Sequence, residues 1–113
     1  MNITYHQGLT TEKWFGMSIF EQMANVGSEI YRTISWREKN ADDSKEAFYR
    51  GLELLDLTIM DAKNKMRLKE LLRTREALVD HFVYDNGYQT TDEQWQNYFY
   101  SFNYAARNKY TSV

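Results

Sequence analysis

Apolar residues recur along most of this chain at intervals of three and four positions, the spacing that keeps one stripe of an α-helix facing a core. A half-buried strand would instead alternate apolar and polar residues. The chain also has no proline and only five glycines, so it lacks the turn residues that a sandwich or barrel requires. We therefore expect an all-α fold, an antiparallel four-helix bundle with a short N-terminal arm or helical turn packed across it.

Capping signals and apolar stripes predict where the four helices lie. Ser18 and Glu21 have the spacing of a capping box and predict the start of the first long helix. Thr91 and Gln94 repeat that spacing before the last helix, and Asn-Gly at 86–87 predicts the end of the third. The expected inward stripes are Ile19, Met23, Val26, Ile30, Ile34; Phe48, Leu52, Leu55, Ile59, Ala62; Leu68, Leu71, Leu72, Leu78, Val79, Phe82; and Trp95, Tyr98, Phe99, Phe102, Ala106.

The length of 113 residues fits a single domain. We divide it into an arm and short helical turn over 1–17 and a helical bundle over 18–113. Gly27 lies beside the stripe of the first long helix, where glycine costs about 1 kcal/mol relative to alanine. Its presence predicts that another helix crosses close to this position.

Composition argues against several classes of protein. The absence of cysteine excludes disulfides and thiolate sites and fits a reducing, cytoplasmic compartment. No stretch approaches the roughly 18 apolar residues of a membrane span, and no secretory leader is recognisable, so no membrane association is expected. The only histidines are His6 and His81, and no Glu-x-x-His motif occurs, so we expect no metal and no other cofactor. The net charge of −2 disfavours a non-specific nucleic-acid binder.

Arg75 falls in the middle of the apolar stripe of the third helix. A buried guanidinium must be paired or fully hydrogen-bonded. Asp56 on the second helix and Glu29 on the first are the acids within plausible reach. We therefore expect Arg75, Asp56 and Glu29 to be buried polar residues, with Arg75 in a structural ion pair or extended to the helix edge.

Five residues separate Arg75 from His81. This arrangement resembles the motif of HEPN domains, in which an arginine and a histidine lie four to six residues apart in a small helical bundle. Many HEPN domains are RNases or partners of nucleotidyltransferases, so the resemblance implies an RNA-processing or toxin-antitoxin role with Arg75 and His81 as catalytic residues. Regular helix geometry instead turns His81 about 120° from Arg75 and predicts an exposed histidine on a polar face.

Other segments resemble small uncharacterised bacterial all-helical proteins. The segments are 20–29, 52–59, 98–100 and 103–107, which begin Phe-Glu-Gln-Met, Leu-Glu-Leu-Leu, Tyr-Phe-Tyr and Asn-Tyr-Ala-Ala. The resemblance implies a bacterial origin and the same all-helical fold. It implies no activity.

A basic cluster precedes and opens the third helix. Its five residues are candidate contacts for phosphate: Lys63, Lys65, Arg67, Lys69 and Arg73. A solvated helix face explains the same pattern. The helix dipole does not favour cations at an N-terminus, so the cluster by itself does not define a nucleic-acid site.

Surplus apolar and aromatic residues outside the core stripes predict an interaction surface. Its members are Tyr49, Leu57 and Met60 on the second helix, Trp36 on the first, and Tyr100, Tyr104 and Arg107 on the last. The three on the second helix are offset from its core stripe by roughly 100–180°. We expect a non-catalytic module that forms a homo-oligomer, with a dimer favoured, through this outer side of the second helix. A further protein partner is a second expectation.

Overall fold

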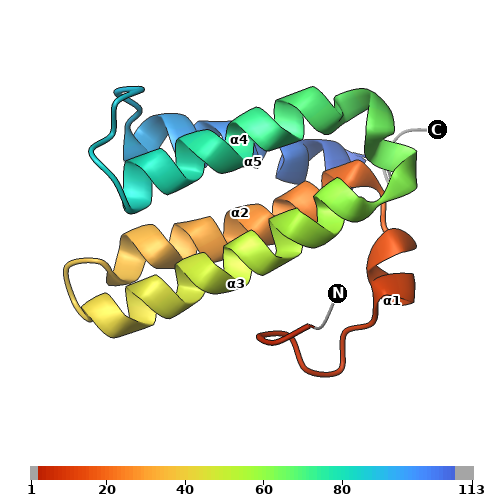
Figure 1. Cartoon of the computed structure of the whole chain (residues 1–113), viewed down its shortest axis with the longest axis horizontal. Helices are drawn as coiled ribbons and strands as arrows, with labels where there is room; N and C mark the ends of the chain where they lie inside the picture. The colour runs from red at the N-terminus through yellow and green to blue at the C-terminus, as the bar shows by residue number, and fades with distance from the viewer. Residues whose placement is uncertain (1–2, 109–113) are drawn as a thin grey trace.

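The computed structural model describes residues 3–108, and within that range the chain contains helices and loops but no strand. The all-α prediction is confirmed. The elements in chain order are α1 (Thr11–Phe15), α2 (Ile19–Trp36), α3 (Ala41–Met60), the 3-10 helix η1 (Ala62–Arg67), α4 (Leu68–Phe82) and α5 (Asp92–Asn108). In Figure 1, α3 and α4 form the layer nearer the viewer, with α2 and α5 behind them.

Side-chain caps fix several of the helix starts. The Ser18 hydroxyl accepts a hydrogen bond from the Glu21 backbone N–H at 3.1 Å, at the predicted start of α2. Before α5 the capping box is complete, because the Gln94 side chain accepts from the Thr91 N–H and the Thr91 hydroxyl accepts from the Gln94 N–H. Both predicted starts are confirmed. The α2–α3 turn ends at Asn40, whose side chain accepts from two backbone N–H groups of α3.

The helix α2 is the centre of the packing, because it lies against both α3 and α5 over much of its length. Its contact with α5 is closest at Gly27, where a Cβ atom would lie only 2.5 Å from the Cβ of Phe99. The helix crossing predicted from Gly27 is thus confirmed. The hydrophobic core is formed by residues from every α-helix of the described chain: Trp14, Met23, Val26, Ile30, Phe48, Leu54, Leu55, Leu57, Leu71, Leu78, Trp95, Phe99 and Phe102.

The third long helix begins at the first residue of its predicted stripe but ends earlier than predicted. The helix begins only at Leu68, because Asp61 caps a preceding 3-10 helix by accepting from the Lys63 backbone N–H at 3.1 Å. It ends at Phe82 rather than near 85–87. Asn86 still makes the turn, with a positive φ of 53°. Three of the five basic residues therefore belong to η1 and not to the start of α4.

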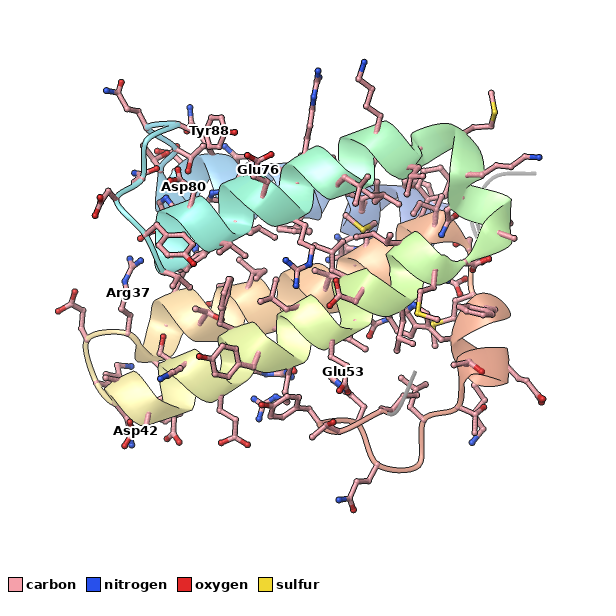
Figure 2. The ribbon with its side chains drawn as sticks, in the orientation of Figure 1. Arg37, Asp42, Glu53, Glu76, Asp80 and Tyr88 are labelled. Atoms are coloured by element: carbon pink, nitrogen blue, oxygen red, sulfur yellow. The ribbon has the colours of Figure 1, made fainter. Side chains whose placement is uncertain are left out.

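The N-terminal segment packs on the side of α3 that faces away from α4 (Figure 1). Trp14 is buried, and its indole N–H donates to the hydroxyl of Thr58 at 3.1 Å. Nearer the N-terminus of the segment, the backbone N–H groups of Thr4 and Tyr5 donate to the Glu53 carboxylate at 2.7 and 3.0 Å. Figure 2 shows Glu53 directed toward this segment. An arm packed across the long helices was expected, and its contacts with α3 are extensive.

Candidate functional site

Arg75 forms the ion pair that was expected of it, but not in the core. Its Nε atom donates to Asp56 Oδ1 at 2.6 Å, which joins α4 to α3. The Arg75 side chain is 39% exposed and that of Asp56 is 33% exposed, so both are partly buried rather than fully buried. Glu29 is buried as predicted, but its partners are Arg32 and Arg50 rather than Arg75.

The predicted stripe of α4 is in fact two stripes, and this explains the exposure of Arg75. Leu71, Thr74 and Leu78 are buried, whereas Leu72 is 49% exposed. At about 100° per residue, Leu72 and Arg75 lie on a line roughly 100° away from the buried one. In the sequence the two lines look like one stripe, because the residues of both lines recur at intervals of three and four.

His81 was expected to be solvated, and this prediction is wrong because its side chain is only 8% exposed. Its Nε2 atom lies 2.9 Å from Asp92 Oδ1, and its Nδ1 atom lies 2.9 Å from the hydroxyl oxygen of Thr90. The loop between α4 and α5 turns back over the end of α4 and brings these two groups onto the ring. His81 therefore bonds to the start of α5 while Arg75 bonds to α3.

The histidine, threonine and carboxylate of this cluster have the residue types of a hydrolytic triad. However, the Thr90 hydroxyl oxygen also accepts the indole N–H of Trp95 at 3.0 Å, and its neighbours hold it inside the loop. Asp92 is paired with Arg37 near the end of α2 as well. Burial on its own raises the pKa of the Asp92 carboxyl, but the bonds from Arg37 and His81 lower it below its ordinary value of 3.8. The arrangement anchors the α4–α5 loop.

A second polar cluster was not predicted as such, although Glu29 by itself was expected to be buried. Glu29 and Glu53 are both buried, and His6 lies between them, with Nε2 3.6 Å from Glu29 and Nδ1 3.2 Å from Glu53. Arg32 and Arg50 neutralise Glu29. The only sequence signal was the position of two glutamates on otherwise apolar faces. The cluster attaches the N-terminal segment to α2 and α3.

The interaction surface predicted on the second helix is only partly exposed. Leu57 is 0% exposed, which contradicts its assignment to that surface. The N-terminal segment bonds to Glu53 and to Thr58 of α3, one turn before Leu57 and one residue after it, and so lies on the side of α3 that carries Leu57. Tyr49 and Met60 remain exposed between that segment and α4, although the Tyr5 ring centroid lies 6.4 Å from that of Tyr49.

Apolar side chains that are exposed or half-exposed gather instead along α4. Those that follow the line of Arg75 are Leu68, Leu72, Val79 and Val83, and we call them, with Arg75 and Glu76, the outer stripe of α4. A shallow hollow of about 540 Å³ lies on this stripe, between Leu72 and Val79 on one side and Tyr84 and Tyr88 on the other. Figure 2 shows Tyr88 beside Glu76 and Asp80 at the end of α4. Its hydroxyl donates to Glu76 at 2.9 Å.

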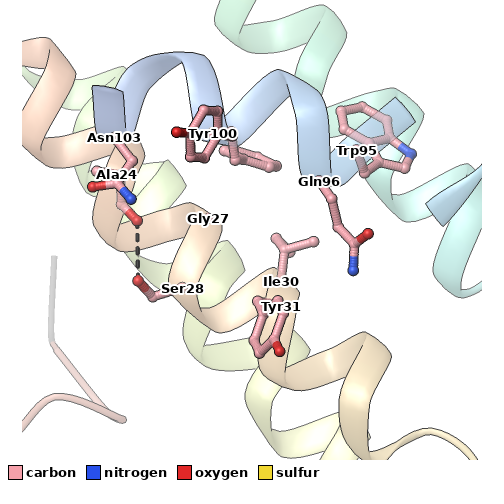
Figure 3. Close-up of a pocket in the computed structure, with 10 residues that line it drawn as sticks. Ala24, Gly27, Ser28, Ile30, Tyr31, Trp95, Gln96, Tyr100 and Asn103 are labelled. Carbon is pink, nitrogen blue, oxygen red and sulfur yellow. Dashed lines mark hydrogen bonds between the residues drawn. The ribbon is translucent and has the colours of Figure 1, made fainter. Parts of the chain in front are cut away.

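A different hollow, of about 210 Å³, lies between α2 and α5. Tyr31 and Tyr100 stand on its two sides, and Ile30 and Gln96 extend into the space between the helices (Figure 3). Tyr100, Tyr104 and Arg107 are exposed on α5, as was expected for interaction residues. Trp36 is also exposed, at the far end of α2.

The basic cluster is partly engaged within the chain. The Lys63 ammonium donates to the Phe15 carbonyl at 3.0 Å and pairs with Asp61, and Arg67 lies over the ring of Phe20. Exposed cations remain at Lys65, Lys69 and Arg73. These three do not converge on one of the hollows described above.

Comparison with family models, with curated proteins and with solved structures gives no significant match. Among residues 3–108 no group of three or more His, Cys, Asp or Glu side chains is placed to hold a metal ion. None of the helices in that range has both the length and the apolar character needed to cross a membrane.

Proposed function

We propose that this chain is a helical interaction module that self-associates through the outer face of α3 and α4. In this proposal α2, α3, α4 and α5 constitute an antiparallel four-helix bundle that acts in the cytoplasm, and α1 is part of an arm across it. The observation that carries the proposal is the outer stripe of α4, where Leu68, Leu72 and the C-cap residue Val83 are exposed and Val79 is partly exposed.

Exposed aliphatic residues are ordinary when they are scattered, but a contiguous row is not. Leu68, Leu72, Val79 and Val83 recur at intervals of four and seven, so they lie on one side of the helix as two aliphatic pairs, with Arg75 and Glu76 between the pairs. Met60 of α3, half-exposed, supplies further apolar surface on the same outer face. The Asp56–Arg75 pair joins the two helices at this face and supplies the polar groups that a specific interface contains.

Burial of Leu57 changes where the interface is expected. The N-terminal segment already covers that side of α3, so the surface to be covered moves to α4 and to the neighbouring edge of α3. The HEPN-like alternative has less support in the geometry. Its arginine is engaged by Asp56 and its histidine is enclosed by Thr90 and Asp92.

The test is a measurement of molar mass by light scattering at micromolar concentration. Wild type should be a dimer, and Leu72→Glu should shift it to monomer, because the substitution places a carboxylate within the apolar part of the interface. Tyr104→Glu is the matched control, since Tyr104 is similarly exposed but lies on α5. A monomeric wild type would refute self-association, and RNA cleavage that Arg75→Ala abolishes would favour the HEPN-like function instead.

A further inference from the structure

The outer stripe of α4 has an order that is nearly the same read in either direction. From the N-terminal end it runs aliphatic, aliphatic, cationic, anionic, aliphatic, aliphatic. The residues are Leu68, Leu72, Arg75, Glu76, Val79 and Val83. When the helix is turned end over end about a point between Arg75 and Glu76, each aliphatic position falls on another aliphatic position and the cation falls on the anion.

These six positions can face one partner at the same time. At about 100° per residue they fall within roughly 100° of the helix circumference, the width of a helix-packing face. All six side chains are exposed or half-exposed. The stripe is therefore an accessible surface over its whole length.

We infer that the occupant of this surface is a second copy of the chain, with the two α4 helices antiparallel and a two-fold axis between Arg75 and Glu76. This inference rests on the proposed self-association and specifies its geometry. Leu72 of each copy contacts Val79 of the other. Leu68 contacts Val83 in the same way.

Charge complementarity selects this arrangement over a parallel one. In a parallel two-fold dimer each residue meets its own copy, so Arg75 would face arginine and Glu76 would face glutamate. The antiparallel dimer replaces these repulsions with two Arg75–Glu76 pairs. Such exposed pairs add little affinity but define register and orientation.

The ion pairs across the axis are compatible with the bonds that each group already makes. A guanidinium has five N–H donors, and Asp56 engages two nitrogen atoms of Arg75. One oxygen of the Glu76 carboxylate accepts the Tyr88 hydroxyl, which leaves the other oxygen for a partner. The hollow beside Val79 lies where the pairing places Leu72 of the second copy, so an aliphatic side chain would fill it.

The experiment uses two variants that are each defective but complementary. Leu72→Lys and Val79→Glu each place a charge against an aliphatic residue of the second copy, so each alone should weaken dimerisation at least about tenfold. Mixed in equal amounts, they should form a heterodimer in which the introduced lysine pairs with the introduced glutamate at one contact, while the unchanged leucine and valine meet at the other. Sedimentation of each variant and of the mixture measures this directly.

The control mixture combines Leu72→Lys with Tyr100→Glu, whose charge lies on α5 and should restore nothing. Leu72 is exposed, and Val79 is a partly buried residue that packs against the edge of the core. Circular dichroism and thermal unfolding of each variant verify that it folds. A mixture that remains as weak as its components would overturn the antiparallel pairing. If wild type and both single variants are all dimers, the α4 interface is wrong but self-association remains. A monomeric wild type would overturn both.

Discussion

Gly27 shows at the scale of one residue why α2 and α5 approach so closely. A helix interior disfavours glycine by about 1 kcal/mol relative to alanine. Glycine in such a position indicates that there is no room for a side chain. Here the space that a Cβ would occupy is taken by Phe99. The nearest atom is the Cβ of Phe99, which cannot move without its backbone.

Gly27→Ala should therefore destabilise the protein by about 1–2 kcal/mol, because the cost of overpacking exceeds the gain in helix propensity. Urea unfolding followed by circular dichroism measures the change. Ser28→Ala, at the neighbouring exposed position, serves as the control for helix propensity. If Gly27→Ala is as stable as wild type or more stable, the close crossing of α2 and α5 is contradicted.

Glu53 is the residue that links the N-terminal segment to α3. Burial on its own raises the pKa of its carboxyl, but hydrogen bonds from the Thr4 N–H, from His6 and from the Tyr5 N–H lower it below its ordinary value of 4.5. Because the pKa of this carboxyl is lower in the folded protein, the unfolded protein binds the proton more readily. Its contribution to stability is thus present above pH 4.5 and is lost as the pH falls through the folded-state value.

Glu53→Gln should destabilise the fold by about 2 kcal/mol at neutral pH, because an amide replaces a carboxylate that accepts several bonds. It should also flatten the fall in Tm between neutral and acidic pH. Thermal unfolding across that range tests both effects. The control is Glu46→Gln, on an exposed side of the same helix, which should change neither the stability at neutral pH nor the acid sensitivity. A Glu53→Gln variant with the acid sensitivity of wild type would show that the carboxylate contributes little.

At the scale of elements, α4 differs from the other long helices in how it is held. It buries Leu71 and Leu78 and reaches α3 and α5 through polar bridges, Arg75 to Asp56 and Thr74 to Tyr98. Its contacts with α3 are much fewer than those between α2 and α3. A helix with one thin buried line and one exposed line is the element with most to gain from a partner.

Across the whole molecule, this uneven packing predicts an order of local stability. Hydrogen exchange should be slowest in α2, which contacts both α3 and α5, and faster in α4. Because the proposed dimer covers α4, its amides should become more protected as protein concentration rises, while those of α2 should change little. Exchange measured at two concentrations tests this, and concentration-independent protection of α4 would argue against the interface.

The class of fold and most of the helix limits follow from the amino-acid sequence alone. Local chemistry is enough for the caps at Ser18 and Thr91, because each depends on neighbours along the chain. Glycine at position 27 predicted that a helix crosses there, but only the structure identifies that helix as α5. The inward residues of α5 could also be read directly from their spacing.

Which of several apolar faces is buried depends on the tertiary arrangement. Leu57 is covered because the N-terminal segment returns to α3, and His81 is enclosed because the loop before α5 folds over it. Leu72 stays exposed because α4 turns a different line of leucines inward. Helical periodicity fixes the angle between side chains on one helix, whereas burial depends on where segments distant in sequence come to lie.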